Sequence, residues 1–278
     1  MTFGPLVTTD WLAREGDTAD LVLFDASTYL PNEGKNGREE YLKAHIPGAR
    51  FFDIDAFSDP DTPLPHTLPS QGRFARLAGA EGVGNDTRVV VYDQKGLFSA
   101  ARAWWLFRYF GHQNVAVLDG GLPKWLAEQR ATETGEPAAA QERSFQVNVH
   151  ARKVRGLGDV LEAIERDDTL ILDARAANRF DGSTAEARPG VASGHIPGSQ
   201  NLPYSRLLRS DHTLQPAETL RTLFSAAGVD GNKPVITSCG SGVTAAVLLL
   251  GMEVAGLPEG ALYDGSWTEW GSRTDTPK

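Results

Sequence analysis

An internal repeat constrains the fold of this chain more than any other feature of its 278 residues. Four short motifs occur in the same order, at similar spacing, in both halves. In the first half they are Leu23–Ser27, Ala44–Gly48, Val89–Asp93 and Val117–Gly121, and in the second half Ile171–Arg175, Gly194–Gly198, Val235–Cys239 and Leu262–Ser266. Four matched motifs at matched spacing predict that one structural unit occurs twice.

Within each half, short runs rich in Val, Ile and Leu alternate with longer segments of helical period. Two such segments, Ser99–Phe110 and Val243–Ala255, are each followed by a glycine, which suits a helix C-terminus. Strands alternating with helices predict an α/β fold in which each half is a mainly parallel sheet flanked by helices. We expect a first domain at 1–135, a linker at 136–150 close to a stretch rich in Gly, Pro and Ala, and a second domain at 151–278.

Charge and cysteine content restrict the partners and the compartment. The formal net charge is −9, so we expect no nucleic-acid partner and no membrane partner, because both kinds of binding rely on basic surface. The single cysteine excludes an intrachain disulfide framework and a multi-cysteine zinc site, which suits a reducing compartment and predicts a cytoplasmic protein. We find no targeting signal and no apolar run of the roughly 18 residues that a membrane span needs.

The single cysteine, Cys239, lies where a parallel strand should end and a helix should begin. Ligands of such sheets collect at the carboxyl ends of the strands. Unpaired amides and the helix dipole at this place favour a thiolate over a thiol. Gly240 and Gly242 permit backbone angles that turn successive N–H groups toward one point, which plain core packing of a cysteine does not require. Cys239 is therefore predicted to be a nucleophile.

The chain resembles the tandem-domain sulfurtransferases of the rhodanese family over nearly its whole length. The resemblance is carried by Cys239–Ala245, by Asp264–Trp267 followed by Glu269 and Trp270, and by Arg179 and Phe180 upstream of Gly194–Gly198. It implies two rhodanese-like domains, the first catalytically silent, with Asp93 where a cysteine would stand. It also implies that sulfur moves from 3-mercaptopyruvate through a Cys239 persulfide to a thiol, cyanide or a thioredoxin-like acceptor, with release of pyruvate and no metal or organic cofactor.

The resemblance also implies roles for residues around Cys239. Arg179 and Arg188 would bind the carboxylate of the substrate, since a guanidinium can do so with two hydrogen bonds. Ser241 would donate its hydroxyl to the substrate, or join Asp55 and His66 in a proton relay. The substrate-binding loop as a whole would consist of Gly240, Ser241, Gly242, Val243 and Thr244.

His195 is not expected to be a general base, although an unperturbed histidine titrates near neutrality. The same His-Ile-Pro-Gly sequence occurs at His45, in the half that lacks the cysteine. One role in building a turn explains both histidines.

Three other functions are alternatives to this one. Thiosulfate-using relatives carry a basic pair after the cysteine, whereas Gly240 and Ser241 are uncharged, so thiosulfate is the alternative donor and not the favoured one. A cysteine phosphatase needs an arginine six residues after the cysteine, where this chain has Ala245. A non-catalytic binding module is the remaining alternative.

Overall fold

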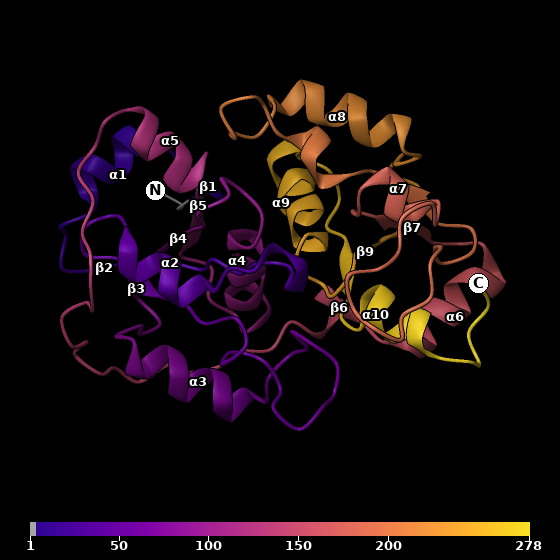
Figure 1. The fold of residues 1–278 in the computed structure, drawn as a ribbon, viewed down its shortest axis with the longest axis horizontal. Helices are drawn as coiled ribbons and strands as arrows, with labels where there is room; N and C mark the ends of the chain where they lie inside the picture. The colour runs from indigo at the N-terminus through magenta and orange to yellow at the C-terminus, as the bar shows by residue number, and fades with distance from the viewer. Residues whose placement is uncertain (1–3) are drawn as a thin grey trace. The chain divides into compact units, whose positions relative to one another are not determined.

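The computed structural model describes residues 4–278 and divides into two compact units (Figure 1). The first unit consists of the described residues up to Pro60, Leu68–His150 and Ser210–Thr213. The second consists of Asp61–Thr67, Ala151–Arg209 and Leu214–Lys278. Each half of the chain therefore contributes one short segment to the unit that is built mainly from the other half.

The first unit contains a sheet of five parallel strands in the order β1-β5-β4-β2-β3. Its strands are β1 (Leu6–Val7), β2 (Leu21–Asp25), β3 (Arg50–Phe51), β4 (Arg88–Tyr92) and β5 (Val115–Leu118). Its helices are α1 (Thr9–Glu15), α2 (Gly37–Lys43), α3 (Gln71–Ala80), α4 (Ala100–Tyr109) and α5 (Gly121–Ala127), with a short 3-10 helix at Pro31–Glu33.

The second unit repeats this topology with the strand order β6-β10-β9-β7-β8, again with every pair parallel. Its strands are β6 (Val154–Arg155), β7 (Leu170–Asp173), β8 (Gln200–Asn201), β9 (Val235–Ser238) and β10 (Ala261–Tyr263). Its helices are α6 (Leu157–Arg166), α7 (Ala177–Phe180), α8 (Ala217–Ala226), α9 (Ala245–Ala255) and α10 (Ser266–Ser272), with 3-10 helices at Ala151–Lys153 and Tyr204–Leu207. The predicted α/β fold with two tandem parallel sheets is confirmed.

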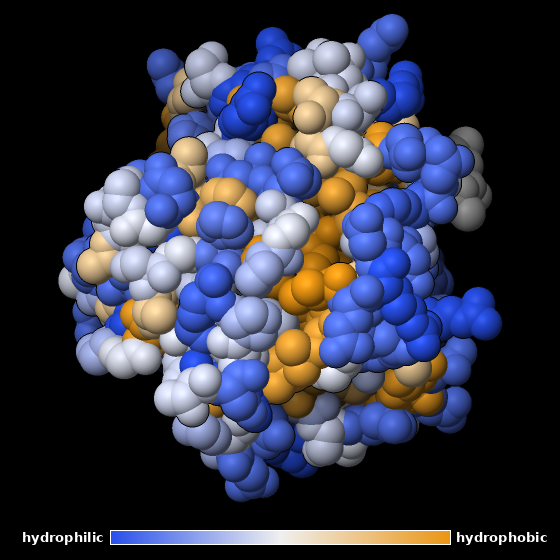
Figure 2. All heavy atoms as spheres, turned by 90° about the vertical axis from the view of Figure 1, so that its right-hand side faces the viewer, coloured by the Kyte–Doolittle hydropathy of each residue, from blue (hydrophilic) through white to orange (hydrophobic). Residues whose placement is uncertain are grey.

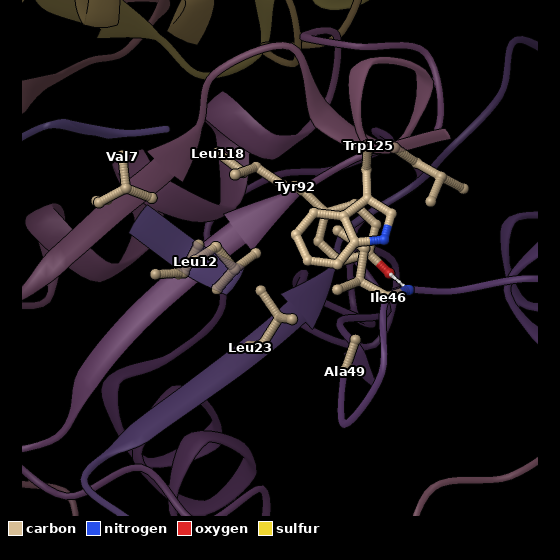
Figure 3. Packing of buried hydrophobic residues seen from close by; sticks show 11 residues of the cluster. Val7, Leu12, Leu23, Ile46, Ala49, Tyr92, Leu118 and Trp125 are labelled. Carbon is tan, nitrogen blue, oxygen red and sulfur yellow. Dashed lines mark hydrogen bonds between the residues drawn. The ribbon is translucent and has the colours of Figure 1, made fainter. Parts of the chain in front are cut away.

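The core of the first unit follows from the alternation of side chains along its strands. Leu23 faces a cluster that Trp125 of α5 and residues of α1 complete (Figure 3). The next residue, Phe24, points to the opposite face, where its ring centroid lies 6.1 Å from that of Phe107 in α4. Because both faces of the sheet are covered, its central strands are apolar on both sides.

The second unit is built in the same way. On one face, Ile171 and Ile236 pack with α6 and with Trp267 and Trp270 of α10. On the other face lies α9, whose residues are almost all buried. Figure 2, which views the molecule from the side of its C-terminus, shows a band of hydrophobic residues between hydrophilic ones. The two tryptophans are completely buried, so they are core residues.

The two helices predicted from the glycine that follows them are present with slightly shorter bounds. The first begins at Ala100 and ends at Tyr109, and the second begins at Ala245 and ends at Ala255. Gly256 caps α9 in the left-handed conformation, with φ of 68°. Among residues 4–278, none of the helices is long and apolar enough to cross a membrane.

The stretch predicted as a linker packs along the first unit. The amide of Arg143 donates to the Gly79 carbonyl at 2.9 Å, and the amide of His150 donates to the Tyr109 carbonyl at 2.8 Å. The domain limits 1–135, 136–150 and 151–278 stay predictions. Asp61–Thr67 groups with the second unit and Ser210–Thr213 with the first, so the units are not continuous in sequence.

Candidate active site

Cys239 lies directly after β9, in the loop that leads into α9, and is only 2% exposed. The two glycines of this loop serve different purposes. Gly242 has φ of 75°, which favours glycine over other residues. Gly240 is outside the left-handed region, and a Cβ atom there would lie 3.1 Å from Nη2 of Arg179. The expectation that both glycines are needed for backbone freedom is therefore right for Gly242, whereas Gly240 permits close approach of a side chain.

The sequence that follows β10 holds this loop in place. The amide of Trp267 donates to the Cys239 carbonyl at 2.9 Å, and the amide of Thr268 donates to the Gly240 carbonyl at 2.8 Å. The hydroxyl of Ser266 accepts a hydrogen bond from the Cys239 amide at 3.3 Å. Ser266 has φ of 50°, a conformation that costs a non-glycine residue free energy and that this buried contact stabilises.

The equivalent loop of the first unit shows what such a loop can bind. Asp93 follows β4, in the place that Cys239 has after β9, and is completely buried. Its Oδ2 accepts hydrogen bonds from three successive amides, those of Phe98 at 2.7 Å, Ser99 at 2.8 Å and Ala100 at 2.9 Å. The loop amides of the first unit thus surround a carboxylate that belongs to the chain itself.

In the second unit the corresponding amides are unpaired. Within residues 4–278, the N–H groups of residues 240–244 have no hydrogen-bond acceptor. The side chain at the start of the loop is the thiol of Cys239, and the loop is one residue shorter, 239–244 against 93–99. Unpaired amides in such a loop are hydrogen-bond donors that an anion can accept from, as the Asp93 carboxylate does in the first unit.

His66 and Ser241 lie in contact, and both belong to the second unit. Nδ1 of the His66 ring lies 2.9 Å from Oγ of Ser241, and His66 is 8% exposed. Asp55 belongs to the first unit and is exposed, with its amide donating to a carboxylate oxygen of Asp53 at 3.0 Å. The structure therefore brings two members of the predicted relay together, and the role of Asp55 stays a prediction.

Arg179, at the end of α7, lies beside the cysteine loop. Its Nη2 donates to Oε2 of Glu186 and is the atom that a Cβ at Gly240 would approach. Its Nε is buried and has no hydrogen-bond partner among the described residues. Arg188 is half-buried in the loop after α7. The proximity of Arg179 to the loop agrees with a substrate role, and the predicted role of Arg188 stays a prediction.

The two His-Ile-Pro-Gly turns are built alike. His195 donates from Nδ1 to the Phe180 carbonyl at 2.9 Å, and its ring stacks on that of Phe180 at 4.0 Å. His45 donates from Nδ1 to the Tyr41 carbonyl at 2.9 Å and stacks on Tyr41 at 4.1 Å. The same contacts occur with and without a cysteine in the unit, which favours a role in the turn for both histidines.

Several residues near the site were not predicted from the sequence. Ser266 could have been found, because it stands where the first repeat has Gly121, with φ of 52°. A repeated His-Thr-Leu sequence at residues 66–68 and 212–214 was also available. The second copy lies outside the site, in the first unit, where the ring of His212 is within 3 Å of the place that a Cβ of Gly96 would take. The burial of Glu186 could not be predicted, because it depends on how the loop after α7 folds back onto Arg175 and Arg179.

No group of three or more His, Cys, Asp or Glu side chains within residues 4–278 is placed to hold a metal ion. The absence of an organic cofactor stays a prediction.

Both units match the family model of the rhodanese-like domain, at residues 8–128 and 157–273. The chain therefore belongs to the rhodanese family. The paired sheets and the strand-to-helix loop that carries Cys239 are described by this one family.

The chain is also similar over nearly its whole length to proteins of known name. The chain is 43% identical over 272 residues to the 3-mercaptopyruvate sulfurtransferase of Escherichia coli K12, covering 98% of this chain and 96% of that protein. It is 42% identical over 275 residues to the human protein of the same name, covering 95% and 91% of the two chains. A crystal structure of an Escherichia coli 3-mercaptopyruvate sulfotransferase superimposes with a TM-score of 0.86 at 41% identity, covering 95% and 99%.

Proposed function

We propose that this chain is a sulfurtransferase that takes sulfur from 3-mercaptopyruvate onto Cys239 and passes it to a thiol. The observation that carries the proposal is the pair of equivalent loops. In one the amides bind the carboxylate of Asp93, and in the other the amides that follow Cys239 in the loop are unpaired within residues 4–278. The names of the relatives support the same activity.

In the first step the Cys239 thiolate attacks the sulfur of 3-mercaptopyruvate. A sulfur–sulfur bond forms and the carbon–sulfur bond breaks. The electron pair of the broken bond stays on carbon, which gives the enolate of pyruvate, and a proton converts it to pyruvate. The enzyme keeps the second sulfur as a persulfide, and the unpaired loop amides stabilise the anionic forms of both states without reorganising.

In the second step an acceptor thiolate attacks the outer sulfur of the persulfide. The new sulfur–sulfur bond forms on the acceptor, the bond to Cys239 breaks, and its electron pair restores the Cys239 thiolate. Cyanide, small thiols and thioredoxin-like proteins are the acceptor classes that we propose. The low exposure of Cys239, 2%, favours small or protruding acceptor groups.

The donor is recognised through its carboxylate. Arg179, in α7, lies beside Gly240 with a buried, unpaired Nε, and Arg188 lies in the loop that follows α7. Guanidinium groups bind carboxylates strongly because the hydrogen bonds are charge-assisted. Gly240, Ser241, Gly242, Val243 and Thr244 add no charge, which suits a monoanion better than the thiosulfate dianion.

Ser241 and His66 handle the proton. The contact of 2.9 Å between Nδ1 and Oγ lets the imidazole and the hydroxyl exchange a proton, and Ser241 stands two residues from the sulfur. In this proposal the hydroxyl donates to the donor or its enolate, and Asp55 is the third member of the relay. Such positioned proton transfer contributes typically about 10²-fold to 10⁴-fold to a rate.

The intact mass of the protein after mixing with 3-mercaptopyruvate tests the nucleophile. We expect a gain of one sulfur atom that a reductant removes. The matched variant Cys239→Ser should gain none. An unchanged mass in the wild-type protein would favour a non-catalytic binding module.

Initial rates with the two donors test the choice of substrate. We expect faster turnover with 3-mercaptopyruvate than with thiosulfate. We also expect Arg179→Ala to slow turnover with 3-mercaptopyruvate more than it slows the alkylation of Cys239 by a neutral reagent. Thiosulfate is the second candidate donor, because a relative from Arabidopsis thaliana, 43% identical over 99% of this chain and 78% of its own length, is named thiosulfate/3-mercaptopyruvate sulfurtransferase 1, mitochondrial. Equal or faster use of thiosulfate would favour that alternative.

The proposal places the protein in the cytoplasm with no nucleic-acid partner. This rests on the net charge of −9 and on the single cysteine. Microscopy of a fluorescently labelled chain in its own cell tests the location.

A further inference from the structure

Glu186 bridges two arginines near the cysteine loop. Its Oε1 accepts a hydrogen bond from Nη1 of Arg175 at 2.7 Å, and its Oε2 accepts one from Nη2 of Arg179. The Glu186 side chain is 5% exposed. A buried carboxylate with each oxygen bound to a different guanidinium has a fixed orientation, and both partners are fixed relative to it.

Arg175 is the anchored end of this bridge. Its side chain is completely buried, and its Nε lies 3.1 and 3.0 Å from the two carboxylate oxygens of Asp173. Its Nη2 donates to the Gly194 carbonyl at 2.8 Å, and its Cζ lies 4.8 Å from the ring centroid of Trp267. Every donor atom of this guanidinium is engaged, so Arg175 holds Glu186 in place.

Arg179, at the other end of the bridge through Glu186, has hydrogen-bond donors without a partner in the described part of the chain. Nη2 is bound to Glu186, whereas Nε and Nη1 have no partner among residues 4–278, and Nε is buried. The Arg179 side chain is 21% exposed and lies against Gly240. An unpaired buried donor is unfavourable by itself and marks a place where an acceptor can bind.

We infer that Glu186 is a positioning residue for the sulfur donor. By holding Nη2 of Arg179, Glu186 fixes the orientation in which Nε and Nη1 meet the carboxylate of 3-mercaptopyruvate. The inference rests on the proposed function, in which Arg179 binds that carboxylate. The four charges of Asp173, Arg175, Glu186 and Arg179 balance, so recognition depends on orientation and not on surplus positive charge.

Because the four charges balance, electrostatics and orientation predict opposite effects on carboxylate binding when the charge of Glu186 is removed. Replacing Glu186 by glutamine leaves a surplus positive charge, which by electrostatics alone would attract an anion more strongly. A glutamine of the same size can accept from only one arginine, and its amide group faces the other. If Glu186 acts by positioning, its removal must therefore weaken carboxylate recognition despite the more favourable charge.

The experiment compares the alkylation of Cys239 by iodoacetate and by iodoacetamide, two reagents of similar size of which only the first has a carboxylate. Cys239 is the only cysteine of the chain, so the rates report on this site. In Glu186→Gln we expect the ratio of iodoacetate to iodoacetamide rates to fall about tenfold, as loss of one charge-assisted contact implies, with the iodoacetamide rate unchanged. KM for 3-mercaptopyruvate should rise about tenfold with little change in kcat. The control Glu165→Gln removes an exposed charge from α6 and should change neither ratio nor KM.

An unchanged or increased ratio in Glu186→Gln would overturn the inference, and so would equal losses with both reagents, which would indicate a disturbed loop. If circular dichroism shows that this variant does not fold, Glu186→Asp replaces it. The shorter side chain keeps the charge but cannot reach both arginines, so the same fall in ratio is expected, and an unchanged ratio contradicts the inference. Arg179→Gln separates the two proposals. If it leaves the ratio unchanged, the carboxylate role of Arg179 is wrong. If it lowers the ratio while Glu186→Gln does not, only the inference on Glu186 fails.

Discussion

Nδ1 of His66 lies 2.9 Å from the hydroxyl oxygen of Ser241, although the two residues are 175 positions apart. The contact exists because the segment Asp61–Thr67 of the first half packs in the second unit. His66 itself has φ of 61°, which is unfavourable for most residues and which the surrounding structure maintains.

Removing either member of this pair should slow catalysis. We predict that Ser241→Ala and His66→Asn each lower kcat with 3-mercaptopyruvate by about 10²-fold, because positioned proton transfer is lost. Asparagine is chosen because it tolerates the left-handed conformation. Steady-state kinetics measure the loss, and the alkylation rate with iodoacetamide should stay close to that of the wild type. A parallel fall in alkylation would indicate damage to the loop instead.

Asp93 should contribute more to stability than an ordinary aspartate. Asp93→Ala leaves three buried amides without their acceptor, and we predict a loss of about 3 kcal/mol in the free energy of unfolding of the first unit. Urea unfolding gives this value. The control Asp17→Ala, at an exposed position, should change it by less than about 0.5 kcal/mol. A loss as small as that of the control would contradict the anion-binding role of this loop.

Asp25 should make stability depend on pH. Burial raises the pKa of Asp25 from 3.8 to about 7, against the opposing effect of hydrogen bonds from Ser27 and Gln94. Between about pH 4 and pH 7 the folded protein keeps this proton while the unfolded chain releases it, so the free energy of unfolding falls as pH rises through that range. At the equivalent place in the second unit, Asp173 is paired with Arg175, whereas the first unit has Ser27 where the arginine stands.

The variant Asp25→Asn removes this dependence. We predict that its stability relative to the wild type improves when the pH changes from 5 to 8, because only the wild type loses the contribution of the raised pKa. Urea unfolding of both proteins at the two pH values measures the difference. Asp17→Asn should follow the wild type at both. A constant difference between Asp25→Asn and the wild type would disprove the assignment.

Gly240 should be required for substrate binding and not for the fold. A Cβ in Gly240→Ala would lie 3.1 Å from Nη2 of Arg179 and would displace the guanidinium. We predict a KM for 3-mercaptopyruvate that is several-fold higher, because a shift of the guanidinium by a few tenths of an ångström weakens its charge-assisted hydrogen bond to the carboxylate without abolishing it. Gly158→Ala, in α6, is the control, because no atom lies within 4 Å of its new Cβ. Equal KM values for the two variants would argue against contact between the loop and Arg179.

The parts of this structure that depend on local pattern were predictable, and those that depend on distant contacts were not. The strand before Cys239 and the helix after it follow from an apolar run and a glycine, so the position of the sulfur could be predicted. The burial of Glu186 could not, because it depends on Arg175, eleven residues earlier, facing into the same space. The place of His66 in the second unit was also not predictable, since no local property of a proline-rich loop shows which unit it will join.

The loop of the first unit is one residue longer than the Cys239 loop, and its amides already bind an anion that is part of the polypeptide. A single codon change that turned Asp93 into cysteine would place a sulfur there but leave the wrong spacing of amides around it. The first half could therefore not become a second sulfur carrier through this substitution alone, because its amides would also have to be re-spaced around the smaller side chain.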